Sequence, residues 1–127
     1  MTMKDFALWG SKFLGLFALI RNTKLQGLRI LCYHGISSAG TDESKFRGKL
    51  YLNAETFARR LNWLAKRGYN VLDLSQALML LGKGRLPRRA VVITFDDGFY
   101  SFYQTGFGLL REHLFPATVY VTSYYVA

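Results

Sequence analysis

An unbroken apolar segment, residues 90–93, most constrains what this chain can fold into, because it leads directly into Thr94-Phe95-Asp96-Asp97-Gly98. Continuous apolar runs, unlike alternating ones, are typical of strands that are buried on both faces of a parallel sheet. We therefore expect a buried strand over residues 90–95. Two adjacent carboxylates at the end of such a strand are costly unless each finds a partner, a metal or a proton, so the pair is a candidate functional site.

Strands and helices alternate along most of the chain. Further strands are expected over residues 29–33, 69–72 and 117–122. Helical spacing and a suitable N-cap, Asn53, predict a helix that starts near residue 54 and ends at Gly68. A short helix is expected over 74–81, and a longer one over 99–114 with Phe99, Tyr103, Phe107, Leu110 and Leu114 on its buried face. This alternation predicts βαβ units with a parallel sheet, and hence an α/β fold.

The composition favours one globular domain of 127 residues. The one cysteine, Cys32, lies in an apolar run, so we expect a buried, inert thiol. A net charge of +9 would attract anionic membranes, anionic polysaccharides or nucleic acid, although basic residues on solvated faces are the simpler explanation. No nucleic-acid-binding motif accompanies the charge, and no nucleic-acid partner is expected.

The N-terminal residues 1–27 form a separate segment. Apolar residues recur at helical spacing between Phe6 and Ile20, and three uses remain open: a helix packed on the domain, an interfacial membrane helix, or a signal or anchor. The segment has no clear cleavage site, and 15 residues are short for a membrane span, which needs about 20. A cytoplasmic or peripheral membrane location is therefore favoured over secretion, and the compartment stays undetermined.

The acidic pair can act together only where the strand ends. Side chains alternate along a strand, so Asp96 and Asp97 converge only if the chain turns, and Gly98 supplies that freedom. The carboxyl ends of parallel strands are where α/β folds place their chemistry. One carboxylate there could hold a metal while the other takes a proton from a bound water.

Four segments in order resemble one family. Thr94-Phe95-Asp96-Asp97-Gly98 resembles the first signature motif of the polysaccharide deacetylases, the NodB-homology or carbohydrate esterase family 4 domain. The Tyr-His segment around Tyr33-His34-Gly35, the helix and short strand over 57–74, and the Pro-Ala-Thr strand from Pro116 are also similar. The resemblance covers residues 28–127 and implies the N-terminal portion of a distorted (β/α) barrel, incomplete in this chain.

The resemblance also implies an activity. Family members are metal-dependent hydrolases that remove N-acetyl groups from the amino sugars of a polysaccharide. Asp96 then corresponds to the catalytic base and Asp97 to a ligand of a divalent metal, expected to be zinc. An N-acetylated polysaccharide is the implied partner, and the N-terminal segment offers a second contact, with a membrane surface.

The family completes its site with residues that this sequence does not contain. It supplies two metal-binding histidines from a His-x-x-x-His motif, whereas the only histidines here are His34 and His113. We therefore expect the chain to be a truncated, inactive part of a deacetylase, which leaves open whether it is itself an enzyme. The alternative is a non-catalytic, basic glycan-binding or membrane-surface module. A phosphoryl-transfer receiver domain is disfavoured, because no suitably placed Lys or earlier acidic cluster is found.

Three further residues have open roles. His34 follows a strand, so it either lines the sugar site or makes a structural hydrogen bond. Tyr33 could stack on a sugar ring or pack in the core. His113 is expected near a helix C-terminus, where a cation is favourable and a structural or exposed role is the simplest interpretation.

Overall fold

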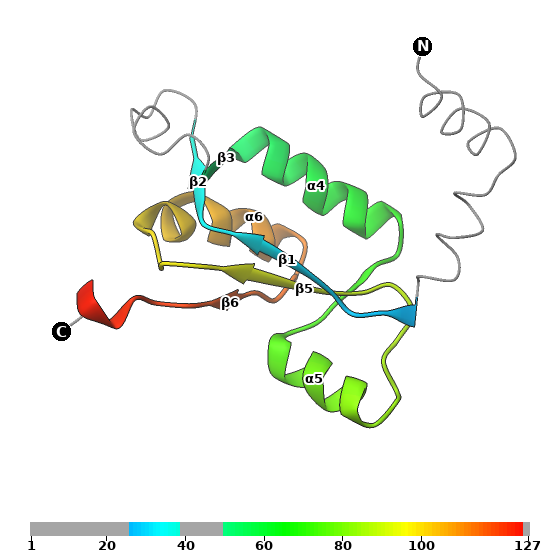
Figure 1. The fold of residues 1–127 in the computed structure, drawn as a ribbon. Coiled ribbons are helices and arrows are strands. Elements are labelled where there is room, and N and C mark those ends of the chain that lie inside the picture. Colours follow the sequence, from blue (N-terminus) through cyan, green and yellow to red (C-terminus); the bar gives the residue numbers. More distant parts are fainter. Residues whose placement is uncertain (1–25, 39–49, 126–127) are drawn as a thin grey trace, which may run out of the picture.

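The central feature of the fold is a parallel sheet built around one strand. In this computed structural model, which describes residues 26–38 and 50–125, β5 (Ala90–Phe95) pairs with β1 (Arg29–Tyr33) along one side. On its other side β5 pairs first with β4 (Asn70–Val71) and then with β6 (Thr118–Val119), and all three pairings are parallel. Figure 1 shows β1, β5 and β6 running side by side. The predicted parallel α/β sheet is confirmed, although β4 and β6 are each only two residues long.

β5 is buried along its whole length, as its sequence predicts. Val91, Ile93 and Phe95 lie on one face, where they belong to the main hydrophobic cluster. The cluster also contains the following residues of the neighbouring elements: Ile36, Phe57, Leu61, Leu64 and Leu110. The opposite face of β1 is open, since Ile30 is 54% exposed. The sheet therefore has one packed face and, along β1, one accessible face.

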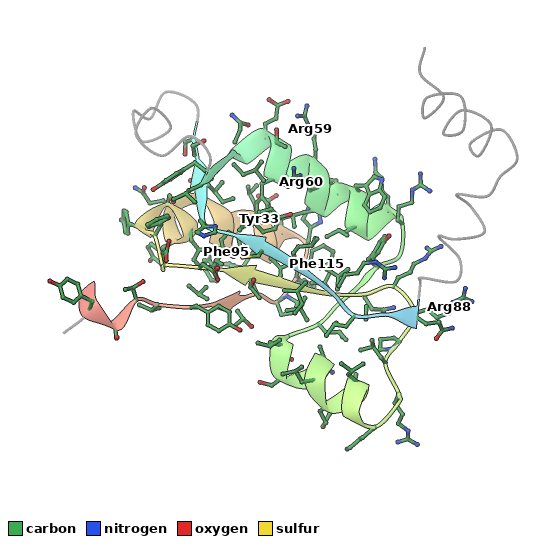
Figure 2. All side chains as sticks on the ribbon, in the orientation of Figure 1. Tyr33, Arg59, Arg60, Arg88, Phe95 and Phe115 are labelled. Atoms are coloured by element: carbon green, nitrogen blue, oxygen red, sulfur yellow. The ribbon has the colours of Figure 1, made fainter. Side chains whose placement is uncertain are left out.

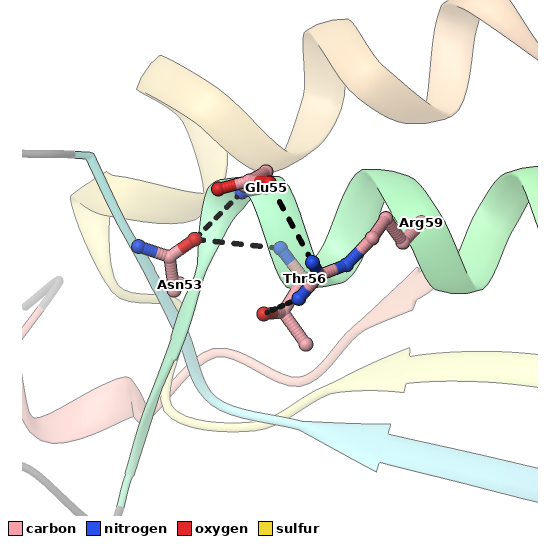
Figure 3. A network of polar contacts seen from close by, with 4 residues as sticks. All are labelled: Asn53, Glu55, Thr56 and Arg59. Atoms are coloured by element: carbon pink, nitrogen blue, oxygen red, sulfur yellow. Dashed lines mark hydrogen bonds and ion pairs between the residues drawn. The ribbon is translucent and has the colours of Figure 1, made fainter.

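Two helices begin after side-chain caps, of which Asn53 was predicted. α4 (Ala54–Lys66) begins after Asn53, whose Oδ1 accepts hydrogen bonds from the backbone N–H groups of Glu55 (2.8 Å) and Thr56 (3.4 Å), as Figure 3 shows. Arg59 adds an ion pair to Glu55 and a hydrogen bond to the Thr56 hydroxyl. α5 (Leu74–Gly82) begins after Asp73, whose carboxylate accepts from the N–H of Gln76. In Figure 1, α4 and α6 lie near each other and α5 lies apart from them.

The last long helix differs from its prediction. The helical stretch contains a π-helical turn, η2 (Phe102–Gly106), followed by α6 (Phe107–Glu112). The predicted buried face is wrong in part, because Tyr103 is 67% and Leu114 90% exposed. A π-helical turn adds a residue to the turn and changes which side chains face the sheet. Ser101, Gly106 and Leu110 are the buried residues of this stretch.

A second, small sheet lies next to the carboxyl end of β1. β2 (Gly35–Ser37) pairs in parallel with β3 (Tyr51–Asn53). Neither of these strands is among the strands expected from the sequence. The backbone N–H of Ile36 donates to the Ser101 hydroxyl at 3.3 Å, which connects this sheet to the helix after the acidic pair.

The surface of the described part is strongly basic. Arg59, Arg60 and Arg88 are exposed and extend from α4 and from the approach to β5 (Figure 2). A short 3-10 turn, η3 (Ser123–Tyr125), closes the described chain. The expected N-terminal helix, with its proposed membrane contact, lies outside the described residues. Among the described helices, none combines the length and the apolar character that crossing a bilayer requires.

Candidate active site

The acidic pair occupies a sharp turn at the carboxyl end of β5. Asp97 and Gly98 both have positive φ angles, 67° and 64°. A positive φ is uncommon for a residue other than glycine, although aspartate tolerates it better than most. Asp96 is half-buried, with a side chain that is 39% exposed, and Asp97 is exposed. The chain therefore turns where the sequence predicted, and it places the two carboxylates in different environments.

The end of β1 holds Asp96 in place. The backbone N–H of Asp96 donates to the carbonyl oxygen of Tyr33 at 2.8 Å, which extends the β1–β5 ladder by one residue. The thiol of Cys32 lies 3.2 Å from Asp96 Oδ2, and His34 Nε2 lies 4.0 Å from the same oxygen. Two strands that are distant in sequence thus bring Asp96, His34 and Cys32 together.

The alternation of strand side chains explains this cluster. Cys32 is paired with Thr94 in the β1–β5 register, so their side chains point to the same face. Asp96 follows Thr94 by two residues and continues that face. Cys32 is exposed, so the expectation of a buried thiol was wrong. The face of β1 that carries Cys32 is open, whereas the apolar run around it suggested burial on both faces.

The sequence analysis did not propose Cys32 as a site residue. The signal that could have found it was the two-residue spacing of Thr94 and Asp96, together with the pairing of Cys32 to Thr94. That pairing cannot be read from one sequence. Desolvation and then the hydrogen bond to Asp96 raise the pKa of the Cys32 thiol above its ordinary value.

Gly35 lets an aromatic ring close one side of the site. A Cβ at Gly35 would lie 2.5 Å from the ring of Tyr51, so a larger residue would displace that ring. The Tyr51 ring in turn stacks on Phe99, just beyond the acidic turn, at 5.5 Å between centroids. The His-Gly sequence at the end of β1 therefore serves two purposes. His34 faces Asp96, and Gly35 admits Tyr51.

A cavity of about 200 Å³ adjoins this cluster. Cys32 and His34 line it on one side, and Tyr51 and Arg60 contribute to its wall. The cavity lies beside the carboxylates, since two of its lining residues, Cys32 and His34, approach Asp96 Oδ2. His34 thus lies where a site-lining residue was predicted, and its sugar contact stays a prediction.

The side chain of Tyr33 lies on the face of β1 opposite to Cys32, and it also contributes to the lining of the cavity of about 200 Å³. Its ring packs against Phe57 at 5.2 Å and Phe95 at 5.6 Å between centroids, and Figure 2 shows Tyr33 and Phe95 in the same central region. The guanidinium carbon of Arg60, Cζ, lies 5.9 Å from the centroid of the same ring. This packing matches the core alternative, and a sugar contact for Tyr33 stays an untested prediction.

The described residues do not fit a complete metal site. Within them, no group of three His, Cys, Asp or Glu side chains comes close enough together to hold a metal ion. A catalytic zinc normally needs three protein ligands. Asp97 could supply one of them, and we derive no chemical step through a metal. His113 caps the C-terminus of α6, where the predicted structural position is confirmed.

Comparisons with known proteins agree with this arrangement. A profile of the family described as Polysaccharide deacetylase matches residues 83–127, which include β5, the acidic turn and β6. A Bacillus subtilis (strain 168) protein named among the polysaccharide deacetylases, YxkH, is 31% identical over 105 residues. The match covers 82% of this chain and 35% of that protein.

The chain corresponds to the N-terminal part of polysaccharide deacetylases. Its described part is the N-terminal portion of the family's distorted (β/α) barrel. The poly-beta-1,6-N-acetyl-D-glucosamine N-deacetylase of Escherichia coli (strain K12) is 32% identical over 92 residues, which are 72% of this chain and 13% of that enzyme. The chain therefore spans only about a third or less of these two relatives.

A solved deacetylase has the same fold. The Streptococcus pyogenes deacetylase PplD, determined in complex with acetate, superposes with a TM-score of 0.66 at 28% sequence identity. The match covers 74% of this chain and 42% of PplD. The expected fold class is confirmed, whereas the roles of Asp96, Asp97, His34 and Tyr33 stay predictions.

Proposed function

We propose that this chain forms the N-terminal part of a hydrolase that removes N-acetyl groups from the amino sugars of a polysaccharide. The observation that carries the proposal is the position of Asp96. It lies at the carboxyl end of β5, half-buried, beside His34 and Cys32 from the end of β1 and next to a cavity of about 200 Å³. The relatives named for polysaccharide or poly-N-acetylglucosamine deacetylation support the substrate class.

Asp96 acts as the general base in this proposal. Its carboxylate takes a proton from a water molecule while the water oxygen bonds to the acetyl carbonyl carbon. The C–N bond then breaks, acetate leaves, and the sugar nitrogen takes up a proton to become the free amine. A positioned general base is worth about 100-fold to 10,000-fold in rate. His34, across from Asp96, is proposed to line the site for the sugar.

Asp97 has a different proposed role, as one carboxylate ligand of a divalent metal. Its exposed side chain and its strained backbone support this role, since strained residues cluster at functional sites. Zinc is the metal that the family resemblance favours. The remaining ligands are not among the described residues, so the 127-residue chain by itself is expected to be inactive.

The test is acetate release from poly-N-acetylglucosamine by the native gene product that contains this sequence. Asp96→Asn should lower the rate at least about 100-fold, because the amide cannot accept the proton. Asp73→Asn is the matched control, since it removes the same charge at a distant position and asparagine caps a helix as well as aspartate does. Wild-type rates in Asp96→Asn would refute the assignment.

The same variants distinguish the proposed hydrolase from the alternative, a non-catalytic glycan-binding module. In a non-catalytic glycan-binding module, acetate release would be absent from every form while the glycan still bound. Equilibrium binding of an N-acetylated oligosaccharide, measured by calorimetry, would then give the same Kd for the wild type and for Asp96→Asn.

A further inference from the structure

Cys32 is the one group near Asp96 that the proposed function leaves unused. It is the only cysteine in the 127-residue sequence, and its side chain is exposed on the open face of β1. Its Sγ lies 3.2 Å from Asp96 Oδ2. The other acceptor within reach, the carbonyl oxygen of Tyr33, is farther away at 3.9 Å. The carboxylate of Asp96 is therefore the better acceptor for the thiol proton.

Thr94 is the neighbour of Cys32 on β5. It is buried, and it pairs with Cys32 in the sheet register. The Thr94 side chain lowers the pKa of the Cys32 thiol, whereas desolvation and the hydrogen bond to Asp96 raise it and prevail. The thiol in turn has its own hydrogen free for Asp96. Cys32 thus adjoins Thr94 of β5 and Asp96, the residue that follows β5.

Both contacts recorded for the Asp96 carboxylate involve the same oxygen. Cys32 Sγ and His34 Nε2 each approach Oδ2, at 3.2 Å and 4.0 Å. Neither of these two contacts involves Oδ1. A thiol is a weak donor, so it can fix the direction of the carboxylate without withdrawing much of the negative charge that a base needs.

We propose that Cys32 is a positioning residue for Asp96, which donates its thiol hydrogen to Oδ2 and leaves Oδ1 to accept the proton of the attacking water. This role rests on the proposed function, in which Asp96 is the base. It adds a residue that the acidic motif does not include. It also means that a reagent that modifies the Cys32 thiol removes the hydrogen bond to Asp96.

The first experiment tests the contact without any activity. Iodoacetamide reacts with the thiolate, and the purified chain has one cysteine, so the alkylation rate at pH 8 reports on Cys32 alone. Asp96→Asn should increase this rate at least about threefold, which corresponds to half a pKa unit. Thr94→Val should lower it, because the hydroxyl no longer stabilises the thiolate. The opposite signs of the two effects exclude a general loosening of the fold.

Asp97→Asn is the matched control for the alkylation experiment. It removes the same charge one residue away from Asp96, at an exposed side chain that is not among the groups acting on the Cys32 thiol. We expect its alkylation rate to match the wild type. An equal increase of the alkylation rate in Asp96→Asn and Asp97→Asn would overturn the proposal, because the thiol would then respond to net charge and not to a specific hydrogen bond. A wild-type alkylation rate in Asp96→Asn would overturn it as well.

The second experiment tests the positioning role in the native gene product. Cys32→Ala should lower kcat about threefold to tenfold with KM unchanged, the effect expected for one hydrogen bond. Cys32→Ser keeps a donor and should recover most of that loss, which a purely structural defect would not allow. Wild-type kcat in Cys32→Ala would overturn the role. If no form released acetate, the proposed function would fail, and the alkylation rates would still decide whether the contact exists.

Discussion

At the scale of single residues, the acidic turn combines function with backbone strain. Asp97 has a φ of 67°, a conformation that side chains other than glycine adopt at a cost of about 1–2 kcal/mol. Asp96, immediately before it, keeps the ladder hydrogen bond to Tyr33. The adjacent aspartates thus have separate structural tasks, and only Asp97 carries the cost of the turn.

We predict that Asp97→Gly stabilises the protein while it impairs the site. Glycine relieves the positive φ, so the free energy of unfolding should rise by about 0.5–1 kcal/mol in urea denaturation. Asp97→Ala serves as the control, because alanine removes the carboxylate and keeps the strain, and it should be no more stable than the wild type. A less stable Asp97→Gly would show that the Asp97 side chain supports the fold.

The acidic pair could be predicted from the sequence, and its surroundings could not. Asp96 and Asp97 stand out because charged residues rarely follow a fully buried strand. Cys32 lies 64 positions away from Asp96, and its contact depends on the register of β1 against β5. A single sequence contains no information on that register, and the apolar neighbours of Cys32 suggested burial.

At the scale of elements, α4 is the segment that the sequence predicts best. A strong N-cap, a regular apolar stripe of Phe57, Leu61 and Leu64, and a left-handed Gly68 all agree with the observed helix. We predict that Asn53→Ala lowers the free energy of unfolding by about 1 kcal/mol, since it removes the side-chain acceptor shown in Figure 3. Asn53→Asp retains an acceptor, so its free energy of unfolding should stay near that of the wild type. Thermal melts of the two variants measure both effects.

The helix after the acidic turn shows where periodicity fails. The backbone N–H of Phe107 bonds to the carbonyl oxygen of Phe102, five residues back, so the turn is wider than an α-helical turn. Residues spaced for an α-helix then rotate away from the sheet, which is why Tyr103 is exposed. Nothing in the sequence marks the π-helical turn. Its last residue, Gly106, lies so close to Ile36 and Phe95 that a Cβ there would be 3.3 Å and 3.7 Å from their side chains.

Two glycines in this helix should respond to alanine with opposite signs. A Cβ at Gly106 would lie 3.2 Å from the Phe102 ring and 3.3 Å from Ile36, so Gly106→Ala should destabilise the protein by about 1–3 kcal/mol. A Cβ at Gly108 would meet nothing within 4 Å, so Gly108→Ala should stabilise the protein by up to about 1 kcal/mol. Chemical denaturation measures both. A stable Gly106→Ala would mean that the helix can move away from β2.

At the scale of the whole molecule, the described sheet is part of a barrel. β1 lies at the edge of the described sheet, and its open face carries Ile30, which is 54% exposed. On the packed side, an apolar groove of about 470 Å³ lies between β1 and α4, with Leu31, Tyr33 and Trp63 in its lining. The family resemblance predicted this partial architecture, whereas composition alone suggested a complete domain.

We predict that the 127-residue polypeptide, produced alone, self-associates through β1. Exposed edge strands pair with other chains, and a lysine on such an edge opposes this pairing. Ile30→Lys should therefore reduce the concentration-dependent rise in the sedimentation coefficient. Leu114→Lys, at a residue that is 90% exposed and away from the sheet, should leave it unchanged. A wild-type chain that stays monomeric at every concentration would contradict this prediction.

The most direct measurement is the rate of acetate release from poly-N-acetylglucosamine by the native gene product and by its Asp96→Asn variant. The account predicts acetate release by the wild type, a loss of at least about 100-fold in Asp96→Asn, and no comparable loss in Asp73→Asn. Equal rates for the wild type and Asp96→Asn, or a wild type that releases no acetate while it binds the glycan, would contradict the central claim that Asp96 is the base of an N-deacetylase.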